Sequence, residues 1–327
     1  MTSSLDLRTE QPTSARPSWL KLVAAWAFGL GLLGWLLHHT PLPQVVDAFG
    51  RPSWIIWCVT IGGIFASYLI RSARLQVVLD LESLGRPTRH WLGLRTDALR
   101  VILMHNAAVN LLPMRAGELS FPWLASRELG MPVSRAIACL LWMRMQDLLV
   151  LLLLGLMVWP GLPLTWRLAG LLSAVGGWFA VQFLVQRVSP QQTNSGIVSK
   201  VRAALTESAH HRPAAWALTT ANWCLKLSAG ACMLDAIAGS GWLQAWSGAL
   251  GGELAAVVPL QGPAGFGTYE AGVWAGLATQ LPANSSALGL AVSAALALHI
   301  CFIVCAVLAG LAASALTRWR SAPPGTN

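Results

Sequence analysis

Long apolar segments constrain this chain more than any other feature. Six of them approach or exceed the roughly 20 residues that cross a bilayer as a helix. They cover residues 19–37, 54–70, 136–158, 164–185, 214–238 and 287–316. Because 55% of the 327 residues are hydrophobic and only 11% are charged, a soluble globular enzyme, a disordered chain and a fibrous protein are excluded. The sequence therefore predicts an all-α polytopic membrane protein with about six transmembrane helices.

Two further apolar regions, residues 99–127 and 243–281, are each broken near the middle by Pro and Gly. A helical arm of a dozen residues covers about 18 Å, which is too short for a hydrocarbon core about 30 Å thick. We therefore expect two re-entrant helical hairpins, one opening to each side of the membrane. The residues expected at their tips are Pro113, Gly117, Pro259, Gly262, Gly265 and Gly267.

The two hairpins share one order of features. Each has an apolar arm, a Pro, a Gly-containing turn, a Glu (Glu118 or Glu270) and a second apolar arm. Opposite orientation of such units is typical of an inverted repeat, in which broken helices meet near the membrane midplane. The alternative is two unrelated segments that Pro and Gly happen to break.

The distribution of basic residues predicts the orientation. Most of the 22 Lys and Arg fall in residues 1–21, 71–98, 127–135, 186–213 and 317–327, whereas the opposite loops hold Arg51 and Arg167. By the positive-inside rule the basic segments are cytoplasmic. We thus expect cytoplasmic tails at 1–18 and 317–327 around one membrane domain, residues 19–316. The same rule explains the net charge of +9 without nucleic acid as a partner.

Ionisable residues inside apolar segments are the main candidates for function. A charge at the bilayer centre costs about 3 kcal/mol, so such residues need partners, water or a use. Arg144 and Asp147 are three residues apart and share a helix face. They either form an internal ion pair, or Arg144 faces an anionic group while Asp147 positions it. The planar guanidinium suits phosphate.

Other basic and polar residues leave similar choices. Arg115 lies in the first Pro–Gly turn, where free backbone N–H groups favour an anion, although the side chain could also extend to the interface. Lys226 needs a carboxylate, which is Glu118, Glu253 or Glu270. Asn110 follows His105 and Asn106 on the first arm, where all three either bond across helices or line a polar path.

Glu118 and Glu270 have two interpretations. A desolvated carboxylate takes up a proton more readily, so these two residues, with Asp147 and Glu253, are candidates for gating or proton coupling. Alternatively, each Glu caps backbone N–H groups at a broken helix. His299, on an apolar helix, is interpreted as a core histidine.

Catalytic and cofactor motifs are not found. The sequence has no GxSxG, HExxH or P-loop pattern, and Cys301 and Cys305, which share a helix face, are interpreted as packing residues rather than metal ligands. We expect no cofactor and no metal. The polar loops are too short for a nucleotide site, so ATP-driven transport would need a partner that supplies the motor.

Several motifs together resemble one family. They are Asn110-Leu-Leu-Pro113-Met-Arg115-Ala-Gly117-Glu118, Arg127-Glu-Leu-Gly130, Arg144-x-x-Asp147, Pro259 and Gly265-x-Gly267-x-x-Glu270. The set resembles the integral-membrane, flippase-like region of lysylphosphatidylglycerol synthases, over residues 20–316. The resemblance implies a bacterial inner-membrane, lipid-translocating fold with paired re-entrant hairpins. Known members move an aminoacylated anionic phospholipid between leaflets, and their aminoacyl-transferase activity resides in a separate domain.

The resemblance implies transport without synthesis, since no sequence for the transferase domain is present here. A separately encoded lipid-synthesis enzyme is then a candidate partner. We expect a flippase for an anionic or phosphate-bearing lipid, bound by Arg115, Arg144, Lys226 and Asn110. Met114, Gln261 and Pro263 depart from the family pattern and leave the cargo open. The alternatives are a lipid-modifying enzyme using His105 and Glu118, and a non-transporting subunit of an envelope-assembly complex.

Overall fold

A computed structural model describes most of the membrane region. The described residues are 19–38, 40–81, 90–159, 161–187, 200–201, 203–205, 212–257 and 262–321. The predicted N-terminal tail, Pro259 and Gln261 lie outside the described residues, as do residues 322–327 of the predicted C-terminal tail and the side chains of Pro113, Met114, Arg115 and Pro263.

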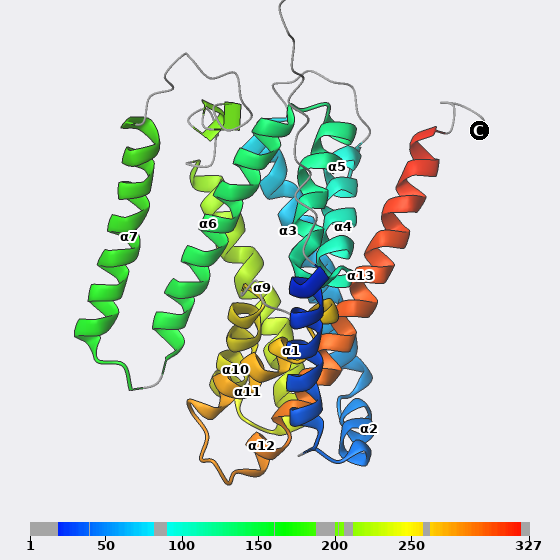
Figure 1. Ribbon diagram of the computed structural model, residues 1–327, viewed down its shortest axis with the longest axis vertical. Coiled ribbons are helices and arrows are strands. Elements are labelled where there is room, and N and C mark those ends of the chain that lie inside the picture. The colour runs from blue at the N-terminus through cyan, green and yellow to red at the C-terminus, as the bar shows by residue number, and fades with distance from the viewer. Residues whose placement is uncertain are drawn as a thin grey trace, which may run out of the picture.

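The described part of the chain is almost entirely helical, and its long helices run along the long axis of the molecule (Figure 1). These are α1 (Trp19–His38), α3 (Trp54–Leu79), α6 (Val133–Val158), α7 (Leu164–Arg187), α9 (Pro213–Ala238) and α13 (Ala291–Ser321). Each contains most of one segment that the sequence predicts to cross the membrane. The all-α polytopic fold is therefore confirmed.

Four of these helices, α3, α6, α7 and α13, are long and apolar enough within the described residues to cross a membrane. In α1 the comparable apolar stretch is the shorter Trp26–Leu36. The 26-residue α9 is long enough, but it buries polar side chains such as Thr219 and Asn222 inside the bundle. Full crossing by α1 and α9 thus remains a prediction from their length and position.

Two broken helix pairs complete the bundle. The first is α4 (Thr96–Leu111), the 3-10 turn η1 (Pro113–Leu119) and α5 (Ser120–Leu129); the second is α10 (Trp242–Ala255), η3 (Pro263–Gly265) and α11 (Thr268–Ala278). The arms of each pair lie side by side, and the pairs occupy opposite ends of the molecule (Figure 1). The turns η1 and η3 contact each other. This arrangement fits two hairpins, while their re-entry into a membrane and their repeat relationship remain predictions.

Close backbone packing holds the second pair together. Ser247 and Gly251 on α10 face Gly272 and Gly276 on α11, and a Cβ built on Gly272 would lie 2.5 Å from the carbonyl oxygen of Gly251. Small residues at this spacing let membrane helices approach closely. The α1 helix crosses the second turn in the same way, since a Cβ on Gly29 would lie 2.1 Å from the Cα of Gly262.

The structure corrects the prediction that the second span ends at residue 70 and that residues 71–98 form a cytoplasmic segment. Instead α3 continues to Leu79 and ends at Asp80, whose φ of 50° terminates the helix. Arg71 and Arg74 therefore lie on a helix and point inward rather than into a loop. The predicted end of the span at residue 70 was wrong. Two arginines interrupt the apolar run there, but they lie inside the helix bundle rather than in a loop.

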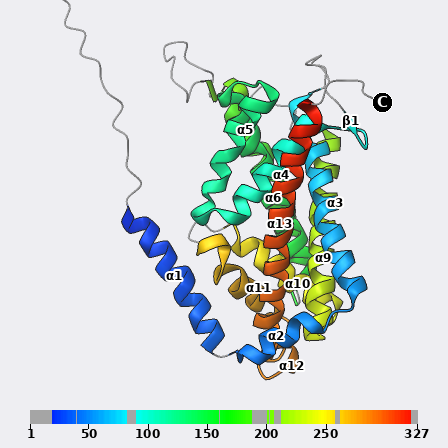
Figure 2. The same ribbon diagram turned by 90° about the vertical axis from the view of Figure 1, so that its right-hand side faces the viewer.

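Three smaller elements were not expected. They are α2 (Leu42–Gly50), α12 (Ser286–Gly289) and an antiparallel ribbon of β1 (His90–Trp91) and β2 (Leu94–Arg95). Because α12 ends at Gly289, the last long helix begins at Ala291 rather than at residue 287. In the side view, α1 tilts away from the bundle (Figure 2), and none of the residues of α7 is buried.

Candidate functional site

A pocket of about 480 Å³ lies where the two broken helix pairs meet in the middle of the bundle. Its lining comes from helices throughout the chain, including α3, α4, α6, α9, α10 and α13. The charged residues that line it are Arg71, Arg144, Lys226, Glu118, Asp147 and Glu253. Apolar side chains such as Leu140 and Leu148 complete the wall.

Asp147 on α6 joins three elements on one side of the pocket. Its Oδ1 lies 2.5 Å from Nη1 of Arg74 and accepts a hydrogen bond of 3.0 Å from the indole N–H of Trp223. Its Oδ2 lies 3.5 Å from Nη1 of Arg144. Arg74 also donates to the Met143 carbonyl at 2.8 Å. Because Arg74 is only 3% exposed, this carboxylate neutralises a buried charge.

Arg144 reaches across the pocket to the first broken helix. Its Nη2 lies 2.7 Å from Oε1 of Glu118, which is in η1. The same nitrogen lies 3.4 Å from Nε2 of His105. The Ser120 hydroxyl donates to the Gly117 carbonyl, so its oxygen accepts from Nδ1 of His105 at 3.1 Å. Nε2 then accepts from Arg144, and His105 is neutral.

Lys226 on α9 has a similar partner. Its Nζ lies 2.7 Å from the Glu253 carboxylate on α10. The ammonium also faces the rings of Trp223 and Phe302, at 5.4 and 4.9 Å from their centroids. Of the three carboxylates left open by the sequence, Glu253 is therefore the partner of Lys226.

Glu270 caps the N-terminus of α11 in the second broken helix pair. Its Oε2 accepts a hydrogen bond of 2.6 Å from the backbone N–H of Gly267, the residue before α11. Its Oε1 lies 2.6 Å from Nδ1 of His299, and Nε2 of His299 lies 3.0 Å from the Ala264 carbonyl. The capping interpretation holds for Glu270. His299 has two partners, as expected of a core histidine, but it also lines the pocket.

Hydrogen counting fixes the charge of the His299–Glu270 pair. A carbonyl cannot donate, so Nε2 of His299 carries a proton. A second proton must lie between Nδ1 and the carboxylate oxygen 2.6 Å away, on one atom or the other. Either way, the pair has no net charge.

Arg71 is held differently from the other cations. Its Nη1 donates to Oδ1 of Asn106 at 2.8 Å, and its guanidinium lies over the Trp223 ring at 5.6 Å from the centroid. Among the described residues it has no carboxylate at ion-pair distance. Among the described residues, Arg71 is therefore the one guanidinium lining the pocket whose charge no bonded partner neutralises.

The structure brings most of the sequence-predicted residues to one place. Those that line the pocket are Arg144, Lys226, Asn110, Glu118, Asp147, Glu253 and Gly265. Gly117 and Gly267 pack closely instead, since a Cβ on Gly117 would lie 2.3 Å from the Ala108 carbonyl oxygen. The tip prediction at Pro259 and the side chain of Arg115 cannot be placed because both lie outside the described residues.

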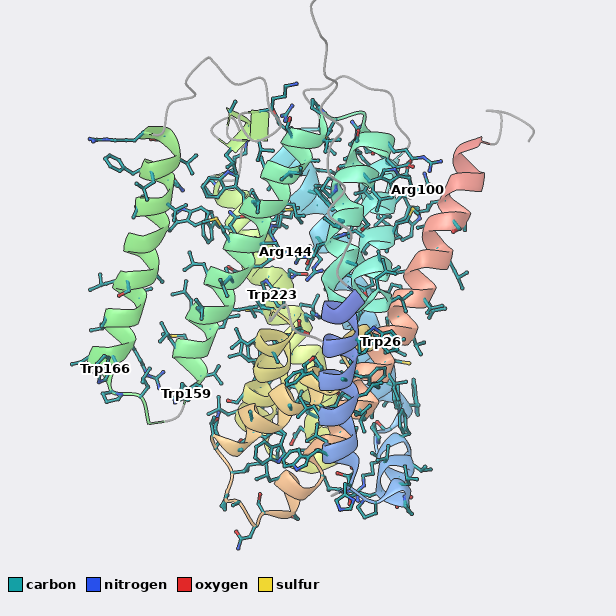
Figure 3. All side chains as sticks on the ribbon, viewed as in Figure 1. Trp26, Arg100, Arg144, Trp159, Trp166 and Trp223 are labelled. Atoms are coloured by element: carbon teal, nitrogen blue, oxygen red, sulfur yellow. The ribbon has the colours of Figure 1, made fainter. Side chains whose placement is uncertain are left out.

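Sequence reasoning missed Arg71, Arg74 and Trp223. One signal was available, because Tyr68, Arg71 and Arg74 are spaced three residues apart and continue one face of α3. Figure 3 places Arg144 and Trp223 near the centre of the molecule, far from Trp159 and Trp166 at one end of α6 and α7. The site thus combines fixed charges of both signs with a partly apolar wall, which suits the polar head of an amphipathic molecule.

Comparisons with known proteins agree with this reading of the fold. No curated protein matches the chain. Residues 19–315 match the family described as the lysylphosphatidylglycerol synthase TM region, so the chain belongs to this family of multi-pass membrane proteins, as the motif resemblance predicted.

Proposed function

We propose that the protein is a flippase that moves an anionic or phosphate-bearing lipid between the leaflets of a membrane. The observation that carries this proposal is the charged pocket formed where two broken helix pairs meet inside an apolar bundle. Broken helices around a central site are typical of transporters that alternate access by moving one repeat against the other. The family match supports a role connected with membrane lipids.

The headgroup would enter the pocket while the acyl chains stay in the bilayer. Arg144 and Lys226 each already hold a carboxylate, at 2.7 Å in both cases. An anionic headgroup can exchange with Glu118 or Glu253 in these pairs, because phosphate oxygens, like carboxylate oxygens, accept charge-assisted hydrogen bonds from guanidinium and ammonium groups. Asn110 also lines the pocket. Arg115, in the adjoining turn η1, completes the proposed binding set.

Gating is assigned to the acidic residues. Glu118, Asp147 and Glu253 bond to the cations that the lipid would contact, so their release accompanies binding. Glu270 instead accepts from the Gly267 N–H at the start of α11 and contacts His299 on α13. Because the His299–Glu270 pair holds an extra proton, its loss would leave two acceptors 2.6 Å apart and would loosen the turn. We infer that proton release there is linked to movement of α11.

The proposed location of the protein is the inner membrane of a bacterium, with both termini in the cytoplasm and residues 19–316 as the single membrane domain. The described helix ends support this orientation. Arg135, Arg187 and Arg212 lie at the end of the bundle where α6 and α9 begin and α7 ends, whereas Arg51 and Arg167 lie at the opposite end (Figure 1). A basic cytoplasmic face is the usual pattern.

The direct test is lipid movement in proteoliposomes that contain the purified full chain. Fluorescent phosphatidylglycerol, an aminoacylated form and a polyprenyl phosphate form the panel, with empty vesicles for background. Movement of one class would support transport and identify the cargo. A lipid species that changes chemically would favour an enzyme. If no lipid moves although the protein is folded, the flippase proposal is wrong and the alternative of an envelope-complex subunit gains support.

Arg144→Gln is expected to slow lipid movement at least tenfold. Hydrogen bonds to charged groups contribute about 1.5–3 kcal/mol, and this variant removes the guanidinium that faces both Glu118 and the pocket. The rate is measured in the same vesicles after equal incorporation. Arg187→Gln is the matched control, because Arg187 ends the exposed helix α7. Equal rates for wild type and Arg144→Gln would contradict the binding role.

Glu270→Gln is expected to remove any acceleration of transport by a proton gradient while the protein stays folded. The amide oxygen of Gln can still accept from the Gly267 N–H, but the side chain cannot exchange a proton with His299. The groups that face this pair are Tyr269 and, across the pocket, Lys226 and Glu253. The measurement is the flipping rate with and without an imposed gradient. An unchanged gradient effect would refute the coupling.

A further inference from the structure

The charged side chains around the pocket do not balance. Four cations, Arg71, Arg74, Arg144 and Lys226, face three carboxylates in the described structure. Each carboxylate is bonded, since Asp147 holds Arg74, Glu118 holds Arg144 and Glu253 holds Lys226. The His299–Glu270 pair and His105 carry no net charge by the hydrogen-bond pattern. The described cluster therefore carries one unneutralised positive charge.

That charge belongs to Arg71. A guanidinium has five N–H donors, and the single hydrogen bond of Arg71 in the described part of the chain is the one from Nη1 to Oδ1 of Asn106. Trp223 covers one face of the guanidinium but takes up none of its N–H groups. Since Arg71 lines the pocket, its remaining donors are available there.

Asn106 supplies a second unused donor at the same place. The residue is 3% exposed and lines the pocket, yet its Nδ2 has no hydrogen-bond partner. A buried amide N–H₂ without a partner costs free energy comparable to a lost hydrogen bond. Its carbonyl oxygen is fixed by Arg71 at 2.8 Å, so the amide group is oriented with its donor side unsatisfied. A bound acceptor would satisfy both residues at once.

We propose that Arg71 and Asn106 form an anion subsite that selects a lipid headgroup with a single net negative charge, such as a phosphodiester. The inference rests on the proposed function for the lipid as ligand, and it names the contact that sets charge preference. Arg144 and Lys226 must exchange a carboxylate before they bind an anion, whereas Arg71 need not. A headgroup with one net negative charge neutralises the described cluster, whereas a zwitterionic headgroup also brings a cation and leaves the cluster with its extra positive charge.

The test is lipid retention by the purified full chain in detergent, measured by native mass spectrometry. The probes are phosphatidylglycerol and phosphatidylcholine with identical acyl chains, which share the phosphodiester and differ in net charge. Wild type is expected to retain phosphatidylglycerol at least tenfold over phosphatidylcholine. Arg71→Gln is expected to bring this ratio close to one. Arg212→Gln should keep it, because Arg212 pairs with Asp80 outside the pocket.

Asn106→Asp is a second variant that tests the same subsite in case Arg71→Gln does not fold. It keeps Arg71 and gives it a carboxylate in place of the amide, so the pair is retained and the extra charge disappears. The same loss of preference is expected. If either folded variant keeps the wild-type ratio, the subsite is refuted.

Two further measurements separate the sources of the anion and the two proposals. Soluble glycerophosphoglycerol, the deacylated headgroup, is added at the concentration of the lipid. If it displaces the lipid equally well, the assignment to a lipid is overturned; if it does not displace the lipid, the assignment is supported. Flipping is scored independently. If charge preference depends on Arg71 but no lipid is flipped, the flippase proposal is refuted and the subsite is retained. If lipid is flipped but the retention ratio is unchanged in the Arg71 variant, the subsite is refuted and the flippase proposal is retained.

Discussion

Asp147→Ala is expected to destabilise the folded protein by about 3–5 kcal/mol. The carboxylate bonds to Arg74 at 2.5 Å and to Trp223 at 3.0 Å, and it lies 3.5 Å from Arg144. Removing one member of a buried ion pair costs about 3–5 kcal/mol, because the other charge stays buried without a partner. Total stabilities are about 5–15 kcal/mol. Size-exclusion chromatography and thermal melting in detergent measure the effect.

The matched control is Arg212→Gln, which breaks an ion pair with Asp80 whose side chains are 43% and 39% exposed. Pairs in water contribute about 0–1 kcal/mol, so this variant should elute and melt like wild type. An Asp147→Ala protein that melts within a few degrees of wild type would contradict the role assigned to Asp147. A double variant, Asp147→Ala with Arg74→Leu, should recover part of the stability, since it removes the stranded charge as well.

Gly272→Ala is expected to separate α10 from α11 and to destabilise the protein by about 1–3 kcal/mol, the usual cost of overpacking. The added Cβ would lie 2.5 Å from the Gly251 carbonyl oxygen and 2.5 Å from the Ala255 Cβ. The sign of the stability change is diagnostic, because a Gly→Ala substitution within a helix normally stabilises the helix by about 1 kcal/mol. The measurement is the melting temperature in detergent.

Gly176→Ala on α7 is the control for this prediction. A Cβ at Gly176 has nothing within 4 Å and the residue lies within a regular helix. The control should therefore melt at or slightly above the wild-type temperature. If Gly272→Ala behaves like Gly176→Ala, the close contact between the two arms is not a determinant of the fold.

Hydropathy and Pro–Gly breaks were enough to locate the long helices and the two helix pairs. The length of an apolar run reports burial in lipid or protein, and a Pro–Gly turn reports where a helix must stop. The same logic failed at α3, because it treats any arginine as the end of a span. Arg74 can continue the helix only because Asp147, 73 residues further along the chain, neutralises it. A partner so distant leaves no local pattern in the sequence.

The sequence predicted which charged residues form the site, but not which of them pair with one another. Arg144, Asp147, Glu118, Lys226 and Glu253 stand out because charges are rare in apolar segments. Their partners depend on which helices are neighbours, and a single sequence does not contain that information. Similar spacing after each turn suggested equivalent roles for Glu118 and Glu270, yet one pairs with an arginine and the other caps a helix. Their surroundings, rather than their positions in the motif, decide what they do.

The central claim is that lipid headgroups cross the membrane through the pocket between the broken helix pairs. The most direct measurement is the rate of phosphatidylglycerol flipping in proteoliposomes for Val109→Trp, whose ring would occupy the pocket without changing any charge. Val304→Trp adds the same ring to the exposed face of α13, where Val304 is 48% exposed. We expect flipping by wild type and by Val304→Trp, and a rate close to that of empty vesicles for Val109→Trp. Wild-type flipping by folded Val109→Trp would contradict this account.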